Sequence, residues 1–139
     1  MIPKFNEFGY LPKGIYKASI KTIEEKFGST TAKRKVLFQG FKSLVKILVK
    51  YKDAIKQLIL NGSFVSNREH PNDFDCLLIV KDNFDIYNPD AEKLLYCKEY
   101  FQGDLLIIPE KYRFECRQRI KALESDKDGI AKGFLEVIL

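Results

Sequence analysis

The sequence contains few of the residues from which zinc sites and disulfide frameworks are built. Its only histidine is His70, and its three cysteines are Cys76, Cys97 and Cys116. An odd number of cysteines, spaced about twenty residues apart, fits neither paired disulfides nor a thiolate metal cluster. We therefore expect reduced cysteines that pack as small buried hydrophobes, and a histidine that is an ordinary loop residue before Pro71.

The chain also lacks long hydrophobic stretches. Its longest apolar runs, at 76–80 and 105–108, are far shorter than the roughly 20 residues that cross a bilayer. Residues 1–13 contain prolines, a glutamate and a glycine, and they lack the continuous apolar core of a secretion signal. No repeat, low-complexity tract or linker is visible. We expect a cytoplasmic protein without membrane contact.

The length and composition favour one domain. A chain of 139 residues, of which 45% are hydrophobic, can bury one sizeable core but is too short for two ordinary domains. We expect a single domain over residues 1–139. It consists of a helical part at 1–53, a core at 54–110 and a C-terminal helix and strand at 111–139.

The charges are unevenly distributed, although the formal net charge is only +5. Residues 1–53 carry 12 Lys and Arg against 4 Asp and Glu, whereas residues 54–139 carry 12 against 15. Such a basic part can face a phosphate-rich partner such as a nucleic acid. The lysines fall mostly singly along amphipathic segments, so a solvated helix surface explains them equally well.

Hydrophobic periodicity predicts two helices in the N-terminal part. Residues 16–27 show apolar side chains at helical spacing and end at Gly28, a natural C-terminal cap. Residues 29–31 offer N-caps for a second helix that runs to about Tyr51 and is the longest element we expect. Its apolar stripe should pack on a sheet while its lysines face solvent.

Short apolar runs bounded by turn residues predict strands further along the chain. These runs lie at 58–60, 74–80 and 104–108, with a last strand at 134–139. Helices are expected at 90–101 and 110–124. The result is an α/β (α+β) fold in which the first three strands are neighbours in one mixed sheet, covered by helices on one face.

The most informative stretch lies between the first two of these strands. The first strand ends in Gly62-Ser63, nine residues follow, and Asp73-Phe74-Asp75 opens the second. Two carboxylates at positions i and i+2 of a strand point to the same face, about 7 Å apart at the backbone. Carboxylate oxygens are the ligands that Mg²⁺ prefers, and a glycine with an adjacent serine can approach phosphate oxygens closely. Together these are the parts of a phosphoryl-transfer site.

This pattern resembles the motif of the polymerase-beta-like nucleotidyltransferase superfamily, in which Gly-Ser or Gly-Gly precedes Asp-x-Asp or Asp-x-Glu between apolar residues. Gly62, Ser63, Asp73 and Asp75 match the motif. The resemblance covers about residues 54–110 and implies a nucleotidyltransferase-type mixed sheet flanked by helices. The superfamily places a third carboxylate on a later strand, where Asp104 is the candidate, although Gly-Asp before a strand is also ordinary turn chemistry.

The resemblance implies a role for each of these residues. Asp73, Asp75 and Asp104 would be the catalytic carboxylates, and they would hold two Mg²⁺ ions on a nucleoside triphosphate, expected to be ATP. A nucleoside monophosphate would pass to a hydroxyl of a protein, a transfer RNA or a small molecule. Asp104 would also draw the proton from that hydroxyl, and pyrophosphate would leave.

The nucleotide phosphates would be held by Gly62 and Ser63, together with Arg68. Arg68 is the one Lys or Arg in the loop that follows them, and an exposed loop charge explains it slightly better.

The whole chain also resembles a family of small bacterial nucleotidyltransferase-like proteins. The segments that carry this likeness are 11–14, 62–65, 71–75, 128–129 and 132–133. Small members of the superfamily often resemble the toxin or antitoxin of toxin-antitoxin and phage-defence pairs. This implies a protein partner, and it leaves open a catalytically weak or inactive module that acts, like an antitoxin, by covering that partner. A nucleic-acid-binding regulator rests only on the basic N-terminal part, which has no groove-reading motif.

Overall fold

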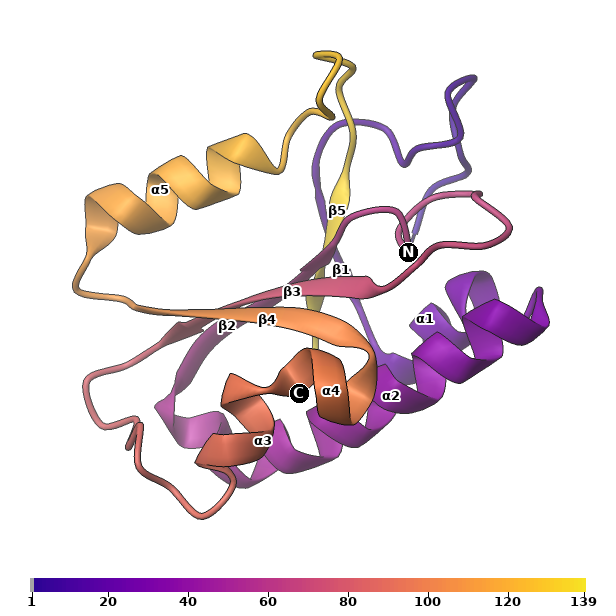
Figure 1. Cartoon of the computed structure of the whole chain (residues 1–139). Helices are drawn as coiled ribbons and strands as arrows, with labels where there is room; N and C mark the ends of the chain where they lie inside the picture. The colour runs from indigo at the N-terminus through magenta and orange to yellow at the C-terminus, as the bar shows by residue number, and fades with distance from the viewer. Residues whose placement is uncertain (1) are drawn as a thin grey trace.

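One mixed sheet of five strands forms the centre of the protein in the computed structural model, which describes residues 2–139 (Figure 1). The strands are β1 (Ile15–Ala18), β2 (Ile55–Asn61), β3 (Phe74–Val80), β4 (Gly103–Pro109) and β5 (Phe134–Val137). Their order is β1-β5-β2-β3-β4, with β1–β5 and β3–β4 parallel and the other two pairs antiparallel. The predicted α/β class and the predicted neighbouring strands are confirmed. Met1, the first residue of the expected domain, lies outside the described residues.

The helical elements surround this sheet. They are α1 (Ile20–Phe27), α2 (Ala32–Leu48), the 3-10 helix η1 (Val49–Ala54), α3 (Ala91–Leu95), α4 (Cys97–Phe101) and α5 (Arg113–Ala122). The N-cap of α1 is Ser19 and that of α2 is Thr31, and each side-chain oxygen accepts a hydrogen bond from the backbone three residues on. Within residues 2–139, no helix has both the length and the apolar character needed to cross a bilayer.

The main core lies between α2 and one face of the sheet. Residues spaced along α2, including Leu37, Phe41, Leu44 and Leu48, are fully buried, because apolar side chains three and four positions apart share one helix face. The lysines at 35, 42, 46 and 50 are exposed. The predicted division of this helix into a packed stripe and a solvated basic face is therefore confirmed.

The opposite face of the sheet is covered in part by α5 (Figure 1). A second, smaller cluster of buried residues lies there. Its members are Ile59, Leu77, Ile79, Ile108, Cys116 and Phe134. The expectation of helices on one face only is wrong, since β3 is apolar on both faces and both must be shielded from water. The three cysteines are free and buried, as predicted.

Several predicted boundaries also differ from the structure. Residues 15–18 form a strand rather than part of the first helix, because they pair with β5 near the other end of the chain. The helix expected over 90–101 is divided at Tyr96, whose φ of −105° and ψ of 43° are not helical. The second helix ends at Leu48, and the 3-10 helix η1 follows it.

Candidate active site

Three carboxylates meet on the face of the sheet that α5 covers further along. Asp75 on β3 lies opposite Asp104 on β4 in the parallel pair, and Asp73 lies two residues before Asp75. One carboxylate oxygen of each residue lies within 4.8 Å of those of the other two. Leu77 and Ile79 follow Asp75 at intervals of two residues, so they share its face of β3. Both belong to the buried cluster under α5. The structure thus brings these three residues together, while their catalytic and metal-binding roles stay predictions.

Charge is concentrated in this carboxylate cluster. Burial, followed by the negative charges of Asp73 and Asp104, raises the pKa of Asp75 to about 6. Burial and then the charge of Asp104 also raise the pKa of Asp73, and Lys98 partly offsets this effect. The Nζ atom of Lys98 lies 3.9 Å from Oδ2 of Asp73. Both pKa shifts mean that the folded protein disfavours the charged carboxylates, and a bound cation would relieve that cost.

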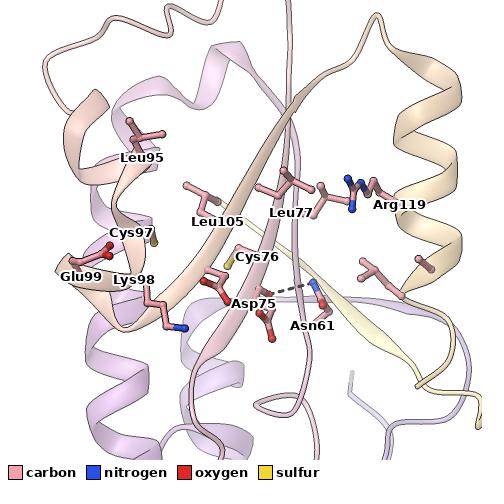
Figure 2. A pocket seen from close by; sticks show the side chains of 14 residues that line it. Asn61, Asp75, Cys76, Leu77, Leu95, Cys97, Lys98, Glu99, Leu105 and Arg119 are labelled. Carbon is pink, nitrogen blue, oxygen red and sulfur yellow. Dashed lines mark hydrogen bonds between the residues drawn. The ribbon is translucent and has the colours of Figure 1, made fainter. Parts of the chain in front are cut away.

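The turn that follows β2 touches the cluster. Gly62 has a φ of +84°, and a Cβ atom at this position would overlap Oδ2 of Asp75. Only glycine satisfies both the left-handed backbone and the close approach. The preceding residue, Asn61, pairs with Asp75 across the sheet, and its Nδ2 donates to the Asp75 carbonyl oxygen at 3.2 Å (Figure 2). The Gly-Ser turn is therefore fixed against the carboxylates.

The loop after this turn is held by Arg34, a residue of the basic N-terminal part. Arg34 is only 2% exposed. Its guanidinium donates to the carbonyl oxygens of Phe64 and Ser66, each at 2.7 Å, and through Nε and Nη2 to that of Arg68. Burial lowers the pKa of Arg34. Its position three residues before Leu37, on the apolar stripe of α2, was the available sequence signal.

Five of the six candidate residues line two adjoining cavities, and Asp73 lines neither. The first, about 340 Å³, is lined by Asp75, Asp104, Lys98 and Arg119, with leucines between them. In Figure 2, Asp75 lies between Lys98 and Asn61, and Arg119 reaches toward the strands from α5.

The second cavity, about 540 Å³, is lined by Gly62, Ser63 and Arg68 together with residues of the loop 125–132. Arg68 is exposed, so its position fits both alternatives weighed for it. The two cavities adjoin where Gly62 touches Asp75.

The fold and the site define a small α/β protein with a cluster of three carboxylates beside a Gly-Ser turn. The chain matches DUF6932, a family of unknown function, over residues 3–138, and it belongs to that family. No curated protein and no solved structure matched it.

Proposed function

We propose that this protein is a Mg²⁺-dependent nucleotidyltransferase, which passes a nucleoside monophosphate from a nucleoside triphosphate to a hydroxyl acceptor. The observation that carries the proposal is the meeting of Asp73, Asp75 and Asp104 in contact with the Gly62 turn. Acidic clusters are common on protein surfaces. In this one, burial and then the repulsion between the carboxylates raise the pKa values of both Asp73 and Asp75, which favours a site that a cation occupies in use.

The donor set fits Mg²⁺. All three side chains offer carboxylate oxygens, and Mg²⁺ is usually held by one or two carboxylates together with waters and substrate phosphates. Asp73 and Asp75 would hold two ions, and Asp104 would help to bind one of them. Bound Mg²⁺ would neutralise the phosphate oxygens and stabilise charge on the attacking and leaving groups.

The remaining tasks belong to side chains and backbone near the cluster. Asp104 is exposed, so it can accept a proton from an acceptor hydroxyl. The glycine at position 62 lets the turn lie against Asp75, and the Ser63 hydroxyl can donate to the phosphate oxygens. Arg34 acts indirectly as a positioning residue, because its bonds to the loop carbonyls keep the Gly-Ser turn in place.

A catalytically weak module that binds a partner protein is the second candidate. The strand β4 lies at one edge of the sheet, and an edge strand presents unpaired backbone groups to a partner. Large apolar side chains are exposed at this edge, including Leu106 on β4 and Leu95 on α3. Both line the smaller cavity, together with Asp75 and Asp104. A toxin or antitoxin that covers this edge would make use of both features.

A thermal-shift titration separates the two candidates. Wild-type protein and Asp75→Asn are titrated with Mg²⁺ and each nucleoside triphosphate, alone and together. We expect wild type to be stabilised by one triphosphate only when Mg²⁺ is present, and the variant to lose this response. Transfer of a radiolabelled nucleoside monophosphate to a protein or RNA acceptor would then identify the reaction. A wild-type protein that responds to no triphosphate would favour the partner-binding module.

A further inference from the structure

The larger cavity is enclosed by three segments that are far apart in the sequence. They are the N-terminal segment around Phe8 and Tyr10, the turn that begins at Gly62, and the loop 125–132. The hydroxyl of Tyr10 donates to Oδ2 of Asp126 at 2.6 Å, which ties the first segment to the third. The amide of Asn67 donates to the Gly9 carbonyl at 2.9 Å, which ties the second to the first. Hydrogen bonds between the segments that enclose the cavity therefore hold it in shape without a ligand.

One side of this cavity offers unpaired donors and positive charge. Lys132 is half-buried, and within residues 2–139 it forms no ion pair. It lies close enough to Asp75 to offset part of the rise in the pKa of that carboxyl, which burial causes in the first place. The backbone amides of Ser63 and Phe64 donate to no acceptor in the described part of the chain. Lys132 and Ser63 both line this cavity, and a cation beside a free backbone amide can form an anion site.

Lys132 is also held firmly by the backbone. Its amide donates to the Glu124 carbonyl at 2.9 Å, and the next amide, that of Gly133, donates to the Leu11 carbonyl at 2.9 Å. The nearby carboxylate of Asp126 forms no ion pair with Lys132 in the described part of the chain. It already accepts bonds from the Tyr10 hydroxyl and from the amides of Asp128 and Ile130.

The wall of the cavity also includes an exposed aromatic ring. Phe8 is 55% exposed, although the cavity it lines is otherwise mostly polar. An exposed ring beside an anion site is suited to a ligand that combines phosphates with a flat base, because every nucleobase has a face that can stack on it.

We propose that the cavity between these three segments binds the nucleoside triphosphate, with Lys132 and the Ser63 turn on the phosphates and Phe8 on the base. This inference rests on the proposed function, because it places the triphosphate beside the carboxylates that would hold Mg²⁺. It leaves the smaller cavity, lined by Asp104 and Arg119, for the acceptor. It adds Lys132 and Phe8 to the residues that the motif indicates.

Two ligands and three variants test the proposal by isothermal titration calorimetry in Mg²⁺. The ligands are ATP, or whichever triphosphate stabilises wild type, and inorganic tripolyphosphate, which lacks a base. Lys132→Met should weaken binding of both ligands by about 10-fold or more, since it removes a charged phosphate contact. Phe8→Ala should weaken the triphosphate by about 10-fold and leave tripolyphosphate unchanged. The control, Lys42→Met, removes an exposed lysine on α2 and should bind both ligands as wild type does.

The outcomes separate this inference from the function on which it rests. If wild type binds no triphosphate with Mg²⁺, the proposed function fails, and the inference fails with it. If wild type binds one and Asp75→Asn does not, but Lys132→Met and Phe8→Ala bind like wild type, the inference is overturned while the function stands. Circular dichroism checks that each variant is folded, and Lys132→Gln replaces Lys132→Met if the latter is not.

Discussion

Replacing Asp75 by asparagine should make the metal-free protein more stable at pH 7.5. The folded protein raises the pKa of this carboxyl from 3.8 to about 6, so it binds the proton more tightly than the unfolded chain does. Wild type therefore loses stability as the pH rises from about 4 through about 6, and this loss is complete above that range. Asparagine keeps a similar shape but cannot ionise, so the variant avoids the loss.

The size of the effect follows from the same pKa. A pKa raised from 3.8 to about 6 corresponds to about 3 kcal/mol. Because the Asp75 side chain is partly exposed, solvent screening should reduce the gain to about 1 kcal/mol. The difference in the free energy of unfolding between Asp75→Asn and wild type should disappear near pH 4. At that pH the folded wild-type protein is protonated at Asp75, so neither folded protein carries a charge there.

Mg²⁺ should reverse the order of stability. A ligand that binds only the folded state at 100 times its dissociation constant adds about 2.7 kcal/mol. Wild type should gain this stability and the variant should gain much less.

Urea denaturation in EDTA and in Mg²⁺, at pH 4 and at pH 7.5, measures the free energy of unfolding of each protein under the four conditions. The control is Asp82→Asn, which changes an exposed carboxylate outside the cluster. If Asp75→Asn is less stable than wild type in EDTA and Mg²⁺ changes neither protein, the carboxylate has a structural role and the reasoning is refuted.

Three further outcomes are expected. Arg34→Lys keeps the charge but loses the planar fork, so loop carbonyls stay unpaired, and urea denaturation should show a loss of about 2 kcal/mol. Gly62→Ala should lower stability by more than about 1 kcal/mol and weaken Mg²⁺ binding. Its matched control is Gly129→Ala, because Gly129 has a similar φ of +79° but open space around it. This control should show only the backbone strain of a positive φ. Equal Mg²⁺ affinity in the two variants would contradict a role for the contact between Gly62 and Asp75. The helix α2 has no acidic residue, and if its exposed lysines bind RNA or DNA, the affinity should fall steeply with added salt. Binding that is absent or insensitive to salt in a filter assay would remove nucleic acid as a partner.

Features that depend only on neighbouring residues could be predicted from the sequence. Turn residues bound the apolar run of β3 on both sides, so its predicted limits of 74 and 80 agree with the structure. The period of two along that strand placed Asp73 and Asp75 on one face. The spacing of apolar residues along α2 likewise separated its buried stripe from its lysines, because both patterns follow from local backbone geometry.

Features that join distant parts of the chain arise only when the protein folds. Residues 15–18 form the strand β1 because β5 supplies their hydrogen-bond partners. A local sequence pattern cannot indicate a partner that lies more than a hundred residues away. The helix α5 lies on the second face because the sheet needs cover there. Arg34 is buried because the carbonyls of a distant loop converge on it, and Lys132 lies near Asp75 because the C-terminal loop folds back beside Gly62. In each of these cases the stabilising partner is distant in sequence, so only folding brings the two groups together.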